Sequence, residues 1–261
     1  MALGMLLLAL AAAALDMRLA VRRYSLASEK VETPVRLVVL TDLHSCRYGA
    51  RQKHLLSAVA AGEPDAVLLA GDIVDDKMAE ENAWITMSAL AEAYPCYYVT
   101  GNHEWRTDAE RICDEMSELG ITVLRGDSAE LVVGEMVLTI CGLDDPDAGL
   151  WQEQWERLEE TVEGDAFTVL LSHRPERVED YEGLGADLVV AGHAHGGQWR
   201  IPGVLNGLLA PHQGLFPPYA GGMYPLEETT MVVSRGLARE STLVPRIFNR
   251  PEMVLIDLLG E

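Results

Sequence analysis

Five apolar runs, each ending in Asp, Asn or His, constrain the fold of this chain more than any other feature. They occupy residues 35–42, 65–72, 96–104, 167–173 and 186–195. Apolar runs of this length are typical of strands that are buried on both faces of a sheet. Because ligands bind beyond the carboxyl ends of strands in open α/β sheets, the polar ends predict a functional site at one sheet edge.

Amphipathic segments between the runs predict helices at residues 79–94, 107–120 and 151–162. Thr107 and Glu110 stand at capping-box spacing at the start of the second helix. After residue 121 the strands follow one another through short turns, with a hairpin connection at residues 133–136. We therefore predict an α/β fold in which two mixed β-sheets pack face to face, with helices outside.

The N-terminal segment has no charged residue in its first fifteen positions. It is shorter than the roughly 20 residues that span a bilayer, and no basic residues precede it as they would in a signal peptide. We favour a membrane anchor; the alternative is a helix buried on all sides in the core. We thus divide the chain into an apolar segment, 1–16, and one domain, 17–261, and expect it at the cell membrane, with the cytoplasm as the alternative.

The net charge of the chain restricts the classes of molecule that it is expected to bind. Its formal net charge is −21, from 41 acidic and 20 basic residues. Such a body repels polyanions, which disfavours nucleic acid as a partner. A small anion held by metal ions remains compatible with this charge, because the metals dominate the local field.

The polar strand ends predict a metal site. Their side chains are Asp42, His44, Asp72, Asn102, His103, His173, His193 and His195. In an extended backbone, residues i and i+2 point to the same side, so Asp42 with His44, and His193 with His195, are expected to act together. Imidazole mixed with carboxylate suits Mn, Zn, Fe or Ni. So many donors exceed one tetrahedral ion and predict two ions about 3.5–4 Å apart.

The order of these motifs, D-x-H, G-D, G-N-H-E, S-H and G-H-x-H, resembles that of the calcineurin-like metallophosphoesterases over about residues 40–200. The stretches "TDLHS", "YYVTGNHEW", "GHAHGGQWRIP" and "APHQGLFPPYAGGMYP" resemble more narrowly the bacterial subfamily typified by YkuE and YaeI. The resemblance implies a four-layer α/β/β/α sandwich. It also implies an N-terminal membrane segment.

The resemblance further implies a role for each residue. The first metal would be held by Asp42, His44, Asp72 and His195. The second would be held by Asp72, Asn102, His173 and His193, so that Asp72 bridges the two ions. His103 would not bind metal; it would protonate the leaving oxygen or stabilise the transition state.

Other residues near the motifs are candidates with two interpretations each. Arg174 and Arg200 are either contacts for a substrate phosphate or members of surface salt bridges. His212 is a candidate substrate contact in the Gly- and Pro-rich loop 203–225. Glu104 either orients the imidazole of His103 or is a surface charge.

We therefore predict a dinuclear metal-dependent hydrolase that attacks a phosphate ester with metal-bound hydroxide. The substrate would be a small or lipid-linked phosphodiester, phosphomonoester or pyrophosphate. One alternative is a metal-binding scaffold or sensor without catalysis, which the presence of His103 disfavours. The other is a nuclease of the same fold, which the negative charge disfavours.

Overall fold

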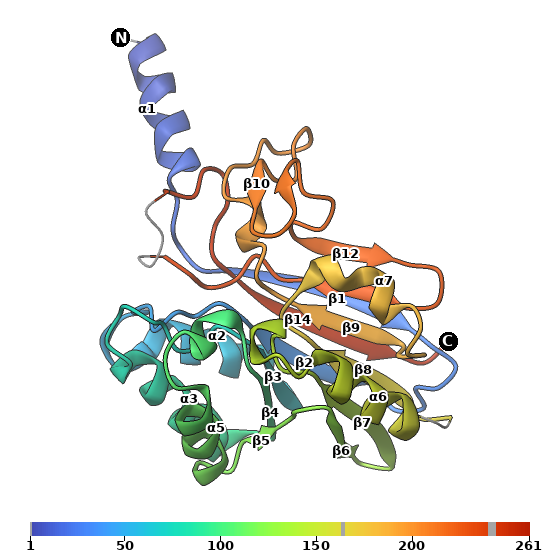
Figure 1. Ribbon diagram of the computed structural model, residues 1–261. Helices are drawn as coiled ribbons and strands as arrows, with labels where there is room; N and C mark the ends of the chain where they lie inside the picture. Colours follow the sequence, from blue (N-terminus) through green and yellow to red (C-terminus); the bar gives the residue numbers. More distant parts are fainter. Residues whose placement is uncertain (1, 163–164, 240–243) are drawn as a thin grey trace.

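Two six-stranded sheets form the body of the protein (Figure 1). The computed structural model describes residues 2–162, 165–239 and 244–261. The first sheet has the order β1 (Ala20–Ala27), β14 (Glu252–Leu259), β2 (Val35–Leu40), β3 (Ala66–Ala70), β4 (Cys96–Val99) and β5 (Thr122–Val123). The second has the order β12 (Gly222–Pro225), β13 (Thr230–Val233), β9 (Leu188–Ala191), β8 (Phe167–Leu171), β7 (Met136–Gly142) and β6 (Asp127–Val133).

Both sheets are mixed. In the first sheet β14 pairs parallel with β1 and antiparallel with β2, while β2, β3, β4 and β5 run parallel. In the second sheet β7, β8, β9 and β13 run parallel, and hairpins add β6 and β12 at the two edges. The parallel strands in the middle of each sheet therefore bring the carboxyl ends of five apolar runs to one side of the molecule.

Helices cover the outer face of each sheet. The first sheet is covered by α2 (Lys53–Gly62), α3 (Glu81–Ala93) and α5 (Ala109–Glu118), and the second by α6 (Trp151–Thr161) and α7 (Val178–Tyr181). The remaining elements are α1 (Ala2–Ala14), α4 (Asn102–Trp105), the β10 (Leu209–Ala210) and β11 (Gly214–Leu215) hairpin, and 3₁₀ turns at Ala50–Gln52, Pro146–Ala148, Pro175–Arg177 and His195–Gly197.

Residue alternation along each strand explains the layers. In β2, Leu37 and Val39 pack into the core between the sheets, whereas Val38 and Leu40 pack under the helices. Leu68 of β3 occupies the same core between the sheets and is fully buried. Each such side chain contributes about 1.5–3 kcal/mol by leaving water. The four-layer α/β/β/α sandwich that the sequence predicts is confirmed.

The start of α5 differs from the sequence prediction. The N-cap residue is Asp108, whose side chain accepts a hydrogen bond from the backbone amide of Arg111 at 3.2 Å. Thr107 instead donates its hydroxyl to the carbonyl of Glu104, 3.0 Å away. The capping-box assignment to Thr107 was wrong by one residue, because Thr107 is engaged by the preceding turn.

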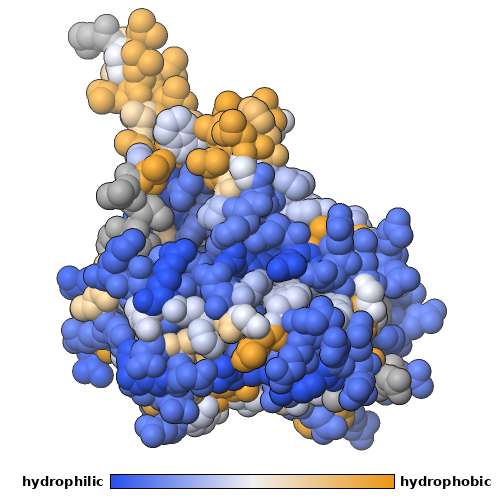
Figure 2. Space-filling model, in the orientation of Figure 1, coloured by the Kyte–Doolittle hydropathy of each residue, from blue (hydrophilic) through white to orange (hydrophobic). Residues whose placement is uncertain are grey.

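The N-terminal helix α1 projects from the body (Figures 1 and 2). None of its residues is buried, so the alternative of a core helix is wrong. Within the described ranges, every helix is too short or too polar to cross a membrane, and the predicted anchor has no support as a span. Met1 of the predicted segment 1–16, and residues 163–164 and 240–243 of the predicted domain 17–261, lie outside the described residues.

The core between the sheets yields a test of the packing. We expect Leu68→Ala to lower the free energy of unfolding by about 2–5 kcal/mol, because it leaves a cavity between two rigid sheets. Val132→Thr, at a strand position that is 61% exposed, should change it by less than about 0.5 kcal/mol. Urea denaturation followed by circular dichroism measures both. Equal losses in the two variants would contradict the assigned core.

Candidate metal centre

The predicted ligands meet where the two sheets come together at their carboxyl edges. Asp42 follows β2 and Asp72 follows β3, both in the first sheet. His173 follows β8 and His193 follows β9, both in the second. Oδ2 of Asp72 lies 3.1 Å from Nε2 of His173, so side chains from the two sheets are in contact. The site therefore straddles the two halves of the sandwich.

The backbone at these positions is not extended, as the i, i+2 prediction assumed. Asp42, His44, Asp72, His193 and His195 all have φ between 46° and 63°, in the left-handed region. Non-glycine residues held there cost of the order of 1–3 kcal/mol each and cluster at functional sites. The turns, rather than strand alternation, aim these side chains, and they send His193 and His195 to different neighbours.

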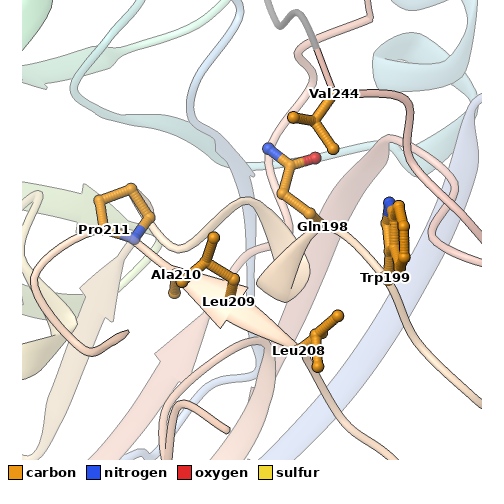
Figure 3. Close-up of a pocket in the computed structure, with 7 residues that line it drawn as sticks. All are labelled: Gln198, Trp199, Leu208, Leu209, Ala210, Pro211 and Val244. Carbon is orange, nitrogen blue, oxygen red and sulfur yellow. The ribbon is translucent and has the colours of Figure 1, made fainter. Parts of the chain in front are cut away.

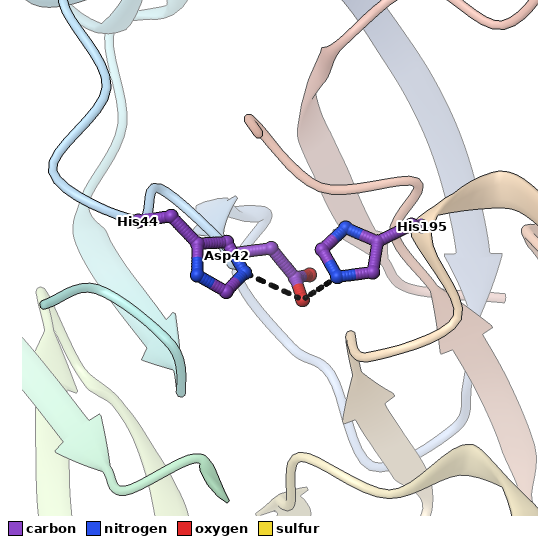
Figure 4. Close-up of side chains that lie close together, drawn as sticks. All are labelled: Asp42, His44 and His195. Atoms are coloured by element: carbon purple, nitrogen blue, oxygen red, sulfur yellow. Dashed lines mark ion pairs between the residues drawn. The ribbon is translucent and has the colours of Figure 1, made fainter. Parts of the chain in front are cut away.

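The first cluster contains Asp42, His44 and His195 (Figure 4). Oδ1 of Asp42 lies 3.9 Å from Nε2 of His44 and 3.7 Å from Nε2 of His195. Oδ2 of Asp72 lies 3.5 Å from Nε2 of His44. All four side chains are buried. The residues predicted for the first metal thus converge in a shielded place.

The second cluster contains Asp72, His173 and His193. Nδ1 of His193 lies 3.2 Å from Nε2 of His173. The amide of Asn102 approaches Nδ1 of His193 to 3.0 Å; without a cation its nitrogen donates there and its oxygen accepts from Arg106. A cation between Asn102 and His193 would turn the amide oxygen inward. Asp72 contacts both clusters, as the predicted bridging ligand must.

The donor set fits divalent cations. Nε2 of His44 is buried and has no hydrogen-bond partner among the described residues. Leaving such groups unsatisfied costs about 1–3 kcal/mol each. The other ring nitrogens are engaged: Nδ1 of His44 lies 3.0 Å from Asp75, and Nδ1 of His173 lies 2.8 Å from the carbonyl of Ala70. This pattern fixes each ring so that Nε2 faces the carboxylates, as in metal-ligating histidines.

The histidines of the two clusters differ in the direction in which their pKa values are shifted. Burial disfavours a charged His173, but the carboxylate of Asp72 outweighs burial and raises the pKa of His173 to about 10. Burial and the neighbouring His173 hold the pKa of His193 well below its ordinary value. Burial likewise lowers the pKa of His195 to about 3. In the metal-free protein one proton on His173 therefore takes the place of a cation beside Asp72.

His103 stands at the rim of the clusters. Nδ1 of its ring lies 2.7 Å from Oδ1 of Asp76, and Nε2 lies 4.0 Å from Oδ2 of Asp72. Burial would lower the pKa of His103, but Asp75, Asp72 and Asp76 raise it. The ring is partly exposed, unlike those of the predicted ligands, so it is the member of this group that solvent and substrate can reach.

Glu104 does neither of the things that the sequence predicted for it. It is fully buried, and its carboxylate accepts hydrogen bonds from the backbone amides of Asp72, Ile73, Val74 and Gly101 at 2.7–3.1 Å. It is therefore no surface charge, and its hydrogen bonds go to backbone amides rather than to the imidazole of His103. Its role is to hold the turn that carries Asp72.

Arg174 and His212 both reach the second cluster. Arg174 is buried and forms a two-pronged ion pair with Asp145, with contacts of 2.5 and 2.7 Å. Nη1 of Arg174 also lies 2.7 Å from Nδ1 of His212, which in turn lies 2.8 Å from Nε2 of His193. Arg174 therefore forms the salt bridges of the alternative interpretation, but its own side chain is buried rather than at the surface. The His212 ring is half-exposed, and its contact with a substrate stays a prediction.

Arg200 does not join the site. Its guanidinium donates to the carbonyl of Gly196 at 3.3 Å and to the side chain of Asn206. It lines a separate cavity together with Arg22 and Arg235. The prediction that Arg200 contacts the substrate phosphate therefore has no geometric support.

Asp75 and Asn249 support the site, and sequence reasoning missed both. Asp75 accepts from the backbone amides of Lys77 and Met78 at 2.9 Å while its other oxygen meets His44. Nδ2 of Asn249 donates to the carbonyl of His195 at 2.7 Å. The acidic pair in "GDIVDD" was a visible signal for Asp75, whereas Asn249 lies 54 residues from His195 and has no local signal.

Two glycines permit the close approach of the strands. A Cβ atom at Gly192 would lie 2.6 Å from Oδ2 of Asp42. One at Gly71 would lie 2.6 Å from Nδ1 of His173, and its φ of 83° further favours glycine. Larger residues would displace the ligands, so the glycines before Asp72 and His193 are part of the site.

Comparison with known proteins identifies the domain. Residues 35–197, which contain every predicted ligand, match the model of the calcineurin-like phosphoesterase family. The chain belongs to this family. The metallophosphoesterase domain is therefore that of a phosphoric ester hydrolase that depends on divalent metal.

Relatives of this metallophosphoesterase agree with the predicted subfamily. It is 28% identical to phosphodiesterase YaeI of Escherichia coli over 87% of this chain and 83% of YaeI. It is 25% identical to the uncharacterized metallophosphoesterase YkuE of Bacillus subtilis, over 85% and 78% of the two chains. A metallophosphoesterase of Campylobacter jejuni is 27% identical over 87% of this chain, which spans 60% of that longer relative.

A solved structure shares the fold of this metallophosphoesterase. The 5'-nucleotidase precursor from Thermus thermophilus superposes with a TM-score of 0.56 at 17% identity, over 79% of this chain and 50% of the nucleotidase. At that identity the likeness extends to the fold alone.

The proton on His173 predicts that metal binding depends on pH. A divalent ion must displace that proton below a pKa of about 10, so we expect release of about one proton and an affinity that rises about tenfold per pH unit from pH 7 to 9. Calorimetry in buffers of different ionisation enthalpy measures the released proton. The metal-free protein, whose His173 pKa exceeds the ordinary 6.5, should lose stability over the same rise in pH. A metal affinity independent of pH would contradict the assignment.

Proposed function

We propose that this metallophosphoesterase is a dinuclear enzyme that hydrolyses a phosphodiester or another phosphoric ester. One observation carries the proposal: Oδ2 of Asp72 lies 3.5 Å from Nε2 of His44 and 3.1 Å from Nε2 of His173, between two separate ligand clusters. A carboxylate in that position would be a ligand to both cations of a dinuclear site.

The proposed ligands divide between the two cations. The first cation would be held by Asp42, His44, Asp72 and His195, and the second by Asp72, Asn102, His173 and His193. Manganese, zinc, iron and nickel all accept such mixed nitrogen and oxygen donors. Bound divalent ions supply Lewis acidity, which activates water at neutral pH and neutralises the charge of the phosphate.

His103 is the proposed general acid. Burial would lower the pKa of the imidazole, but Asp75, Asp72 and Asp76 raise it above its ordinary value, and Nδ1 lies 2.7 Å from Oδ1 of Asp76. Nε2 faces the clusters, 4.0 Å from Oδ2 of Asp72. In the reaction the water oxygen would bond to phosphorus and one P–O bond would break. The proton at Nε2 would pass to the departing oxygen, and the proton released by the water would restore the imidazole.

A bridging role for Asp72 has a direct test. We expect Asp72→Ala to lose both ions and to lose hydrolysis of bis-p-nitrophenyl phosphate, because both clusters share this carboxylate. Elemental analysis and a release assay for p-nitrophenol measure the two effects. Asp114→Asn, an exposed position on α5, is the matched control for charge. Retention of one ion with full activity would contradict the bridging role.

General-acid catalysis by His103 has a separate signature. We expect His103→Ala to keep its metal content and to lose about 10²–10⁴-fold in kcat. The loss should be larger for an alkyl ester than for a p-nitrophenyl ester, because nitrophenolate leaves readily without a proton. His54→Ala, an exposed histidine on α2, controls for the removal of an imidazole. Equal losses for both leaving groups would show that His103 is not the proton donor.

A further inference from the structure

Two apolar projections rise from the same end of the molecule (Figure 2). One is α1, whose leucines are largely exposed; Leu8 is 74% accessible. The other is the loop around β10 and β11, where Val204 is 83% and Phe216 66% accessible. We call α1 together with Trp199, Val204, Leu209, Leu215 and Phe216 the apolar face. Exposed apolar surface of this extent marks a binding surface for a protein or a membrane.

The composition of α1 favours a bilayer surface. Its 13 residues carry no charged side chain, so the helix has no polar face to turn toward a protein surface or solvent. Such a helix suits contact with the hydrocarbon of a bilayer.

Positive charge at the base of α1 selects anionic lipid. Arg18 and Arg22 follow the helix, with side chains 83% and 59% exposed. Arg250 donates to the carbonyl of Arg18 at 2.8 Å, and Arg22 lies 3.9 Å from the buried carboxylate of Glu252. Asp16 is the carboxylate that contacts both Arg18 and Arg250, at 2.8 and 3.4 Å. These exposed arginines stand out in a chain of net charge −21, and an anionic lipid surface attracts them.

A cavity lies beside the apolar face. It has a volume of about 490 Å³ and lies between Trp199, Leu209 and Val244 (Figure 3). Trp199 and Leu209 also belong to the apolar face. Pro211, another wall residue, directly precedes His212, whose Nδ1 is 2.8 Å from Nε2 of His193. Its apolar lining and its size suit a hydrocarbon chain.

We propose that the apolar face docks the protein on an anionic bilayer, and that the cavity takes an acyl chain of a lipid phosphoester whose phosphate reaches the metal centre. The acyl chain would lie against Leu209 and Trp199 while the phosphate passes His212. Hydrolysis adds water across one P–O bond, with the oxygen on phosphorus and the proton on the departing alcohol. The substrate part rests on the proposed function; the docking part does not.

Docking is tested by co-flotation of the full chain with vesicles. We expect binding to phosphatidylcholine vesicles that contain phosphatidylglycerol, weaker binding to phosphatidylcholine alone, and loss at high salt. The double variant Leu215→Glu and Phe216→Glu should bind at least about tenfold more weakly, because two apolar side chains no longer enter the interface. Val132→Glu, equally exposed on β6, should bind like the wild type. Equal binding by all variants, or self-association through the apolar face in place of vesicle binding, would overturn the proposal.

The cavity is tested by a ratio of rates. We expect Leu209→Trp, which fills the cavity, to lower the rate on a long-chain phospholipid relative to bis-p-nitrophenyl phosphate by about tenfold. Val132→Trp should leave this ratio unchanged. Turnover of bis-p-nitrophenyl phosphate without turnover of any phospholipid would overturn the lipid substrate alone. Absence of both activities in metal-loaded protein would overturn the proposed function, and the flotation result would still decide docking.

Discussion

The carboxylate of Glu104 fixes the turn on which the metal centre depends. It gathers backbone amides from the turn after β3 and from Gly101 at the end of β4. Hydrogen bonds to a charged group contribute about 1.5–3 kcal/mol each, so together they offset the left-handed backbone of Asp72. Burial, and next the charge of Asp72, raise the pKa of Glu104 to about 7, so the two carboxylates repel each other. A divalent cation beside Asp72 would relieve that repulsion.

The metal centre also depends on the packing of the two sheets, because its ligands come from both of them. Asp42 and Asp72 belong to one sheet, and His173 and His193 to the other. The apolar core between the sheets sets their separation, and the glycine next to each cluster lets the backbones approach. A substitution in this core, although far from the site, would therefore change the distances between the ligands.

The layers, and the polar side chains that come together at the sheet edge, could be predicted because both depend on short patterns. Apolar runs predict buried strands, and the polar residues at their ends predict the sheet edge. The family membership is confirmed, while the role of each ligand stays a prediction. The geometry was predicted less well: the i, i+2 argument assumed extended backbone, whereas His193 and His195 sit in left-handed turns. Arg200, Glu104 and Asn249 were misjudged or missed because their partners are set by tertiary contacts between segments that the sequence does not connect.

The pairing of β1 with β14 has a mechanical consequence. Eight residues of β1 lie in parallel register with β14, and the amide of Phe248 donates to the carbonyl of Ala14 at the base of α1. The first helix thus leaves the body from a strand that is joined to the last strand of the chain. Its base is anchored to the same sheet that carries Asp42 and Asp72. Because one sheet joins α1 to the metal centre, the metal centre would keep a fixed distance and orientation relative to any surface that α1 contacts.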